Sequence, residues 1–389
     1  MRRLVMIWAL LATPLAAQVE QGPPNAEFEP AFPAQTRAPA LEETAVQADW
    51  LVRGLSNPWG IAVLPDGRML VSERPGRLRL IGPEGVSEPI NGLPEVDARR
   101  QGGLLDVAVR PDFDRTRQVW WTYAKRVDGG TVTAAATGRL SEDGTRMQDV
   151  QDIFVQEPPS PNPMHYGSRI VFGLDGMAFI TTGEHFSRSE RQLAQDLDTT
   201  YGKVVRVTPM GGDVPPDNPF VGEDGLDTIW SYGHRNMQGA VIGPQGRLWT
   251  IEHGPAGGDE LNRPLPGRNY GWPVISYGVN YNRSSVGSGE AVREGMEQPV
   301  YYWDPVIAPG GMMFHNGRGG FDWNGDLLIG SLNPGGLVRL RFAEGRVAGE
   351  ERLLRDIGRV RDVEVLGDGT VLLLIDSPDG GIMRVRPAG

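Results

Sequence analysis

A hairpin pattern recurs six times along the chain. Each copy contains an alternating apolar strand, a tight turn that is usually Asp-Gly, and a second apolar strand. The copies span 60–72, 105–123, 170–182, 240–251, 320–330 and 363–375. A single hairpin of this kind is only marginally stable in water, so neighbouring copies must bury one another's faces. The repeat therefore predicts an all-β fold, a six-bladed β-propeller.

The spacing of the copies argues against the main alternative fold, a β-sandwich. Successive hairpins begin roughly 45 to 80 residues apart, whereas sandwich strands follow one another at shorter and more even intervals. In a propeller, long insertions collect on one face around the central channel, and most of the polar and aromatic candidates lie in such insertions. Only one helical stretch is expected, at 189–196.

The N-terminus has the three regions of a secretory signal peptide. Two arginines precede an apolar run from Leu4 to Leu11, and Ala16-Ala17 ends the small-residue stretch. The run is too short to span a bilayer, and its charge-then-apolar order disfavours a buried N-terminal helix. We expect cleavage near residue 17 and a periplasmic protein. Residues 18–45, rich in Pro, Ala and Glu, are expected to form a flexible lead-in outside the fold, with the propeller domain at 46–389.

Composition excludes several classes of site and partner. The chain has no cysteine, so it cannot contain a disulfide, a thiolate metal site or a cysteine nucleophile. Its formal charge of −11 becomes −13 once the two arginines of the signal peptide leave (−11 − 2), which disfavours nucleic acid and anionic lipid as partners. No glycine-rich turn opens a helix after a strand, so no nicotinamide site is expected.

Two short segments carry the chemistry that is most visible in the residues themselves. His165 is one of five histidines, and a side chain with a pKa near 6.5 is well suited to take a proton from a sugar hydroxyl. A lone histidine is nevertheless more often structural. Arg235 and Asn236 are consecutive donors in a glycine-bounded loop, where both can converge on one ligand.

Eleven segments in order resemble the soluble aldose sugar dehydrogenases that depend on pyrroloquinoline quinone (PQQ), in the glucose/sorbosone dehydrogenase family. The resemblance covers nearly all of the chain from Asn57 to Arg386. It implies calcium-dependent and PQQ-dependent oxidation of aldoses to lactones, with electrons passed to a quinone or another small periplasmic acceptor. The segments are 57–60, 100–105, 165–169, 182–184, 201–206, 233–239, 252–255, 259–262, 269–273, 303–309 and 359–362.

The resemblance assigns five residues to the reacting centre. It implies that His165 deprotonates the anomeric hydroxyl, and that Glu184, where the family more commonly has Asp, orients the imidazole. Arg235 would polarise a carbonyl of the quinone, with Asn236 beside it. Gln101 matches a residue that hydrogen-bonds the sugar and base region.

Further residues are assigned to substrate and cofactor binding. Trp303 matches the segment that flanks the sugar and packs on one face of the planar cofactor. Arg359 and Arg361 alternate on a presumed strand and would hold PQQ, a tricarboxylate that suits guanidinium groups. The chain departs from the family at Asn333, where a lysine directed at PQQ is usual.

Two calcium ions are implied by the same resemblance. The carbonyl groups of the Gly254-Pro255 turn would bind the ion that also chelates PQQ, because calcium prefers oxygen ligands. Asp259, Glu260 and Tyr270 resemble the neighbourhood of a second, structural calcium.

Two other functions stay open at the level of sequence. One is a cofactor-free propeller that binds a sugar or a protein, and the other is a calcium-dependent propeller lactonase with a central Asp/Asn/Glu cage. Arg235, Arg359 and Arg361 favour the dehydrogenase, because a hydrolase does not need three cations for a tricarboxylate.

Overall fold

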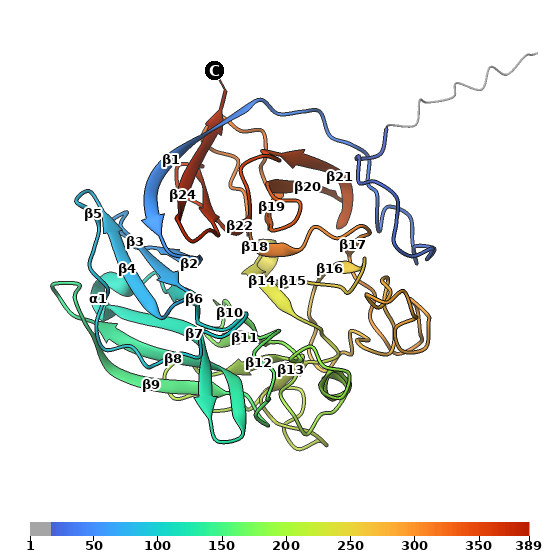
Figure 1. Cartoon of the computed structure of the whole chain (residues 1–389), viewed down its shortest axis with the longest axis horizontal. Coiled ribbons are helices and arrows are strands. Elements are labelled where there is room, and N and C mark those ends of the chain that lie inside the picture. The colour runs from blue at the N-terminus through green and yellow to red at the C-terminus, as the bar shows by residue number, and fades with distance from the viewer. Residues whose placement is uncertain (1–16, 389) are drawn as a thin grey trace, which may run out of the picture.

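Six four-stranded antiparallel sheets form a ring around a central channel in the computed structural model, which describes residues 17–388 (Figure 1). The innermost strands β2, β6, β10, β14, β18 and β22 line the channel, and each contacts the inner strands on both sides. The predicted six-bladed β-propeller is confirmed. All but the last residue of the predicted signal peptide lies outside the described residues.

The sheets follow the chain in order, so each blade is a meander. Blade 1 contains β2 (Pro58–Val63), β3 (Met69–Glu73), β4 (Arg77–Gly82) and β5 (Gly85–Val86). Blade 2 contains β6 (Leu104–Val109), β7 (Gln118–Val127), β8 (Gly130–Leu140) and β9 (Met147–Val155). Blade 3 contains β10 (Gly167–Phe172), β11 (Ala178–Thr182), β12 (Val204–Val207) and β13 (Ile229–Ser231).

The second half of the ring repeats this arrangement. Blade 4 contains β14 (Met237–Ile242), β15 (Leu248–Glu252), β16 (Asp259–Asn262) and β17 (Tyr301–Trp303). Blade 5 contains β18 (Pro309–Phe314), β19 (Leu327–Ser331), β20 (Leu337–Ala343) and β21 (Arg346–Leu353). Blade 6 contains β22 (Val360–Val365), β23 (Val371–Ile375), β24 (Gly380–Pro387) and β1 (Val46–Leu55). Short helical turns occur at α1 (Phe113–Thr116), η1 (Glu190–Ala194) and η2 (Pro244–Gly246).

The two ends of the described chain close the ring together. Strand β1 precedes blade 1 in sequence but pairs with β24, from Val46 opposite Pro387 to Leu55 opposite Gly380. The outer strand of blade 6 therefore comes from the N-terminal part of the chain (Figure 1).

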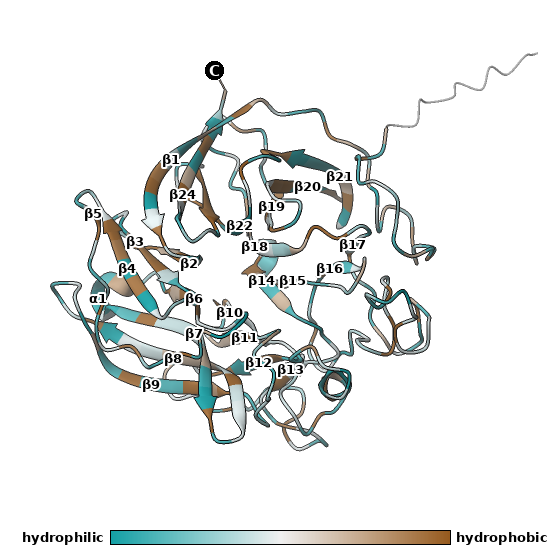
Figure 2. Ribbon diagram, in the orientation of Figure 1, coloured by the Kyte–Doolittle hydropathy of each residue, from teal (hydrophilic) through white to brown (hydrophobic). Residues whose placement is uncertain are grey.

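The hydrophobic core is divided among the six interfaces between neighbouring blades. In Figure 2 brown, apolar stretches run along strands such as β4. The cluster between blades 1 and 2 includes Leu70, Leu104 and Trp121, all fully buried. The cluster between blades 3 and 4 is the smallest of the six and has Phe179 and Met237 among its five buried residues.

A buried ion cluster joins three blades inside the channel. Arg169 of β10 places Nη1 2.9 Å from Asp106 Oδ1 on β6 and 2.8 Å from Asp362 Oδ2 on β22. Its guanidinium carbon lies 4.4 Å from the centre of the Trp59 ring. The inner strands of blades 2, 3 and 6 are therefore held together by charge as well as by apolar packing.

Two local expectations were wrong. The first half of the hairpin predicted at 320–330 is not a strand, because Gly319 and Gly320 have positive φ and the rings of Phe321 and Trp323 stack at 3.9 Å in the core between blades 5 and 6. The inner strand of that blade is β18 instead. The helix expected at 189–196 is a shorter 3₁₀ helix, η1.

The expectation that residues 18–45 take no part in the fold is also corrected. This segment runs along blades 4 and 5 before entering β1 (Figure 1). The Asp304 carboxylate accepts the backbone N–H groups of Asn25 at 2.8 Å and Ala26 at 2.9 Å, and the fully buried Gln35 donates to the carbonyl oxygen of Pro299 at 3.0 Å. Composition gave no signal of this docking, because the partners lie more than 250 residues away.

Candidate active site

Loops at one end of blades 3 and 4, where β10 and β14 begin and β11 ends, bring His165, Glu184 and Arg235 together. His165 precedes β10, Glu184 follows β11, and Arg235 precedes β14. His165 Nδ1 lies 3.0 Å from Glu184 Oε2, and Arg235 Nε lies 3.9 Å from Glu184 Oε1. All three side chains are buried. The structure thus assembles the three residues that the sequence assigned to catalysis.

Close backbone contact fixes this arrangement. His165 has a φ of 47°, in the left-handed region, and β11 ends directly against it. A Cβ atom at Gly183 would collide with the carbonyl oxygen of His165, so this position requires glycine. Gly183 bridges to Asn236, and the Glu184 N–H donates to the Arg235 carbonyl oxygen at 3.1 Å.

Gln101 and Asn236 support the histidine loop through its backbone. Gln101 Oε1 accepts the His165 N–H at 2.8 Å, and Asn236 Oδ1 accepts the Gly167 N–H at 3.0 Å. Both residues are therefore at the site. Their amide oxygens position the loop that carries the histidine.

Burial and neighbouring charges tune the histidine–carboxylate pair. Burial lowers the pKa of His165, the Glu184 charge opposes this effect, and the Arg235 cation adds to it, so the pKa lies below its usual 6.5. Burial alone would raise the pKa of Glu184. The charge and hydrogen bond of His165 and the charge of Arg235 outweigh this effect, so the pKa lies below its usual value. Glu184 is therefore an ionised acceptor. His165 donates to it through Nδ1–H, which leaves Nε2 of the neutral ring as a free base.

An aromatic-lined cleft of about 300 Å³ opens beside this pair. The Arg235 guanidinium lies 5.1 Å from the centre of the Trp272 ring, and Phe186 packs edge-on against His165 at 5.0 Å. Sequence reasoning had not assigned a role to Phe186 or Trp272. Trp272 could have been found, because it lies within one of the segments that resemble the family, whereas Phe186 carried no signal. Tyr281 and Arg191 complete the cleft wall.

Two buried guanidinium groups have unused donors. Arg235 Nη1 donates to the carbonyl oxygens of His253 at 2.8 Å and Gly254 at 2.7 Å. Arg361 Nη1 donates to Gln238 at 2.6 Å, and its Nη2 donates to Asp376 at 2.9 Å. Within residues 17–388, neither Nε atom has a hydrogen-bond partner. Donors left unpaired at a buried site are expensive unless a ligand accepts from them.

His253 lies among these cations. Its Nε2–H donates to the Pro309 carbonyl oxygen at 2.7 Å. Burial lowers its pKa to about 3, and the nearby Arg235 and Arg361 lower it as well. The ring is therefore neutral near pH 7, and the cations are balanced by carboxylates such as Asp376.

Arg359 and Asn333 lie at the margin of the site. The Arg359 side chain is half exposed and shares Asp376 with Arg361, through a 3.1 Å bond from Nη2 to Oδ2. Arg359 Nη1 also donates to the carbonyl oxygen of Leu332, next to Asn333. Asn333 itself is exposed and lines a separate surface pocket with Arg352.

Trp303 is not in contact with the cleft, which corrects its predicted role at the sugar. Its ring is fully buried in the core between blades 4 and 5. It packs edge-on against Tyr301 at 4.9 Å, and its Nε1–H donates to Glu350 at 3.2 Å. The side chain points into the core because β17 is the outer strand of its blade, a position that the sequence did not reveal.

The residues assigned to calcium lie near one another, but their oxygens differ in availability. Glu260 and Glu252 face each other across β15 and β16, and Asn262 Nδ2 donates to both carboxylates, at 3.2 and 3.0 Å. Burial raises the pKa of Glu260 well above its usual value, and the Glu252 charge adds to the effect. Gly254, Pro255, Glu260 and Tyr270 all line one small cavity beside Arg235.

Several of those oxygens already have partners. The Gly254 carbonyl oxygen accepts from Arg235, and the Tyr270 hydroxyl donates to the Arg263 carbonyl oxygen at 2.6 Å. The Asp259 carboxylate accepts three backbone N–H groups, from Gly254, Ile307 and Ala308, at 2.7 to 2.8 Å. The Asp259 carboxylate therefore holds the backbone of two loops together beside the residues assigned to calcium.

Within residues 17–388, no three His, Asp or Glu side chains come together in a way that could hold a metal ion. No helix in that range is both long and apolar enough to cross a membrane.

Known proteins share this fold and much of this sequence. A family model described as "Glucose / Sorbosone dehydrogenase" matches residues 55–384. The chain is 41% identical over 358 residues to aldose sugar dehydrogenase YliI of Escherichia coli, covering 90% of this chain and 94% of the relative. A solved glucose dehydrogenase is 43% identical with a TM-score of 0.84, covering 88% of this chain and all of that one. The PQQ-bound aldose sugar dehydrogenase of Streptomyces coelicolor is 26% identical with a TM-score of 0.70, covering 88% and 99%.

Proposed function

Because the chain belongs to the glucose/sorbosone dehydrogenase family and is therefore a sugar-oxidising oxidoreductase, we propose that it oxidises aldoses at the anomeric carbon with PQQ as cofactor. The observation that carries the proposal is the buried His165–Glu184 pair beside Arg235. The products are lactones, and the electrons pass to a quinone or another small acceptor. The proposed location is the periplasm, on the basis of the N-terminal segment.

His165 is the proposed general base. Its Nε2 lone pair takes the proton of the anomeric hydroxyl while a hydride leaves the anomeric carbon. Glu184 holds Nδ1–H, fixes the tautomer and stabilises the imidazolium as it forms. Phe186 and Trp272 supply apolar ring faces that suit a pyranose.

The residues present fit PQQ, whose quinone carbonyl supplies the hydride-accepting carbon. Within residues 17–388, the buried Nε–H groups of Arg235 and Arg361 have no hydrogen-bond partner, and Arg359 offers a third cation at the margin. Guanidinium groups suit both the carboxylates of such a cofactor and the negative charge that develops on a carbonyl oxygen. Asn333 carries no charge. Because its side chain is exposed, we assign it no more than a peripheral contact with the cofactor.

The residues also fit one calcium ion in the small cavity next to Arg235. Glu252 and Glu260 offer carboxylate oxygens, and the Gly254-Pro255 turn lines the same cavity. A divalent cation would offset the burial and the repulsion from Glu252 that together raise the pKa of Glu260. The contact of Gly254 with Arg235 favours the carboxylate pair over the Gly254 carbonyl as the main ligand.

Reconstitution tests the proposal directly. Purified cofactor-free protein is mixed with PQQ and calcium, and glucose-dependent reduction of a soluble dye is followed with the absorption band of the bound quinone. We expect both signals, and both should require calcium. A protein that binds glucose but neither takes up PQQ nor reduces dye would be a sugar-binding propeller, and a lactone-hydrolysing protein without dye reduction would be a lactonase.

A further inference from the structure

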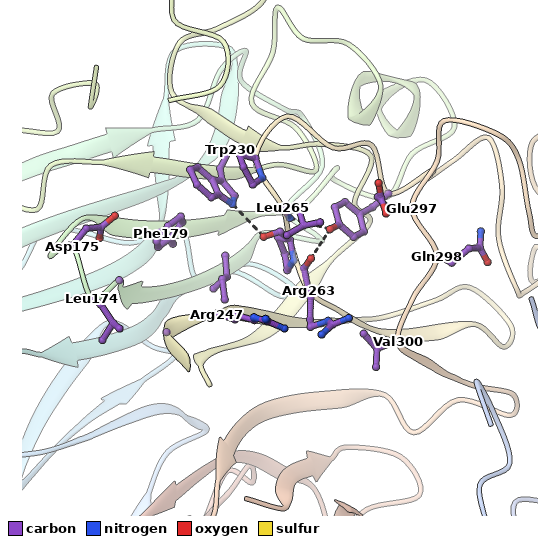
Figure 3. A pocket seen from close by; sticks show the side chains of 16 residues that line it. Leu174, Asp175, Phe179, Trp230, Arg247, Arg263, Leu265, Glu297, Gln298 and Val300 are labelled. Atoms are coloured by element: carbon purple, nitrogen blue, oxygen red, sulfur yellow. Dashed lines mark hydrogen bonds between the residues drawn. The ribbon is translucent and has the colours of Figure 1, made fainter. Parts of the chain in front are cut away.

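A second cavity, of about 690 Å³, opens at the interface between blades 3 and 4 (Figure 3), and it shares no lining residue with the cleft beside His165. The core cluster at this interface is the smallest of the six. The insertion after β16 forms the far wall of the groove, with Glu297 and Val300 labelled in Figure 3. The groove is thus a space that the blade packing leaves unfilled.

The groove combines aromatic walls with exposed aliphatic side chains. Phe179 packs edge-on against Trp230 at 5.2 Å, and the Trp230 Nε1–H donates to the Pro264 carbonyl oxygen. At the rim, Leu174 is 85% exposed and Leu265 is 50% exposed. Large apolar side chains exposed around a cavity mark a surface that binds an apolar group.

Two arginines supply the polar end. Arg247 and Arg263 lie side by side at one edge of the groove in Figure 3. Across residues 17–388, neither guanidinium makes an ion pair, and that of Arg263 lies 5.4 Å from the centre of the Trp249 ring, a contact that leaves its N–H groups unused. They are therefore free to donate to carbonyl oxygens of a bound molecule.

Tyr270 separates this groove from the small cavity proposed for calcium beside Arg235 and lines both. Its ring stacks on His234 at 4.6 Å, with 18° between the planes. His234 Nδ1 bonds Glu252 at 2.9 Å, and Glu252 accepts the Arg235 N–H at 2.5 Å. A molecule in the groove would lie one aromatic ring away from the proposed calcium cavity, which Arg235 also lines.

We propose that the groove between blades 3 and 4 binds the electron acceptor, a planar quinone with an apolar tail. The ring would lie against Trp230 and Phe179, its carbonyl oxygens would accept from the two arginines, and the tail would lie on Leu174 and Leu265. The inference rests on the proposed dehydrogenase function. An aldose loses two electrons and two protons on becoming a lactone, and a quinone takes up two electrons and two protons, with protons exchanged through water, on becoming a quinol.

Binding is tested without cofactor. The purified protein is titrated with a ubiquinone that carries a short isoprenoid tail, and quenching of tryptophan fluorescence gives Kd. The double variant Leu265→Asp, Arg247→Gln should raise Kd about tenfold or more, because it places a charge on the apolar wall and removes a donor. The matched control is Val292→Asp, which is equally exposed at 50% but outside the groove, and should leave Kd unchanged.

A second readout separates this inference from the proposed function. In protein loaded with PQQ and calcium, the double variant should raise KM for the quinone while KM for glucose and the rate with a small soluble dye stay unchanged. An absence of dye reduction in wild type would overturn the dehydrogenase function itself. Dye reduction together with an unchanged quinone Kd in the double variant would overturn the groove site, as would equal competition by a fatty acid without a quinone ring.

Discussion

His165 depends on its surroundings for the base role that we assign to it. Nearly complete burial keeps the ring neutral near pH 7, and the bond from Nδ1 to Glu184 leaves the Nε2 lone pair available as the base. Gln101 and the left-handed backbone of His165 hold the loop in place. A histidine with free rotation would share its lone pair between two nitrogens and lose this orientation.

Replacing His165 with Gln should lower the rate of sugar oxidation by about 10² to 10⁴, because general-base catalysis contributes about that factor. PQQ uptake should change little, since the proposed cofactor contacts come from arginines. Steady-state kinetics and the bound-quinone absorption band measure the two effects. His315→Gln, at another buried histidine between blades 5 and 6, is the control and should keep wild-type turnover. Turnover above about one part in a hundred in His165→Gln would exclude the base role.

Glu184→Gln tests whether the Glu184 charge raises the pKa of His165. The carboxylate raises the pKa of His165 against the effect of burial, so its removal should lower that pKa further. Because the base must be neutral, the acidic limb of the pH–rate profile should move to lower pH, while the maximal rate falls for lack of a group that stabilises the imidazolium. A profile that keeps its acidic limb in place would show that Glu184 does not govern the titration of His165.

At the scale of elements, the register of β15 and β16 places Glu252 opposite Glu260 in a buried cavity. Like charges directly opposite one another destabilise a strand pair. Asn262 donates to both carboxylates but brings no positive charge. A proton or a metal ion is therefore needed to relieve the repulsion between the two carboxylates of this strand pair.

Metal-free protein should lose stability as pH rises above about 4.5, because the folded state holds a proton on Glu260 that the unfolded chain releases at its ordinary pKa. Calcium should restore the melting temperature at pH 8, and Glu260→Gln should flatten both the pH dependence and the calcium response. Thermal melts with and without a chelator measure the pH dependence and the calcium response.

The control is a second buried carboxyl group. Burial raises the pKa of Glu364 to about 8, so Glu364→Gln should also flatten the pH dependence but leave the calcium response intact. A full calcium response in Glu260→Gln would remove that residue from the metal site.

At the scale of the molecule, the ring is closed by two means. Strand β1 completes blade 6 with the N-terminal part of the chain, and the Asp106–Arg169–Asp362 cluster joins blades 2, 3 and 6 across the channel. Burial raises the pKa of Asp106 to about 6, a rise that Arg169 limits and Asp362 promotes. One guanidinium thus balances two carboxylates inside the channel.

Arg169→Met should destabilise the fold by about 3 to 5 kcal/mol, because breaking a buried ion pair leaves uncompensated charge. Urea denaturation measures the free energy of unfolding. Arg68→Met removes an exposed pair with Asp66 and should cost less than about 1 kcal/mol. Equal losses in the two variants would mean that the channel cluster contributes no more than a surface ion pair.

The sequence alone determined the blades and most of the catalytic constellation. Alternating strands and tight turns are local patterns, so five of the six hairpins could be located from residues a few positions apart. His165, Glu184 and Arg235 could be predicted because the segments that carry them resemble a family motif by motif, and their convergence follows from loops that meet at one face of a propeller.

The tertiary structure decided what depends on residues distant in sequence. Trp303 turns into the core because β17 is an outer strand, and Asp259 is taken by backbone donors from a loop nearly fifty residues later. Residues 18–45 dock on blades 4 and 5 through partners such as Asp304. The groove between blades 3 and 4 arises from how two sheets and an insertion pack. The register of paired strands, the side of a sheet on which a side chain lies and the packing between sheets are all fixed by contacts between elements. No local sequence pattern encodes these contacts.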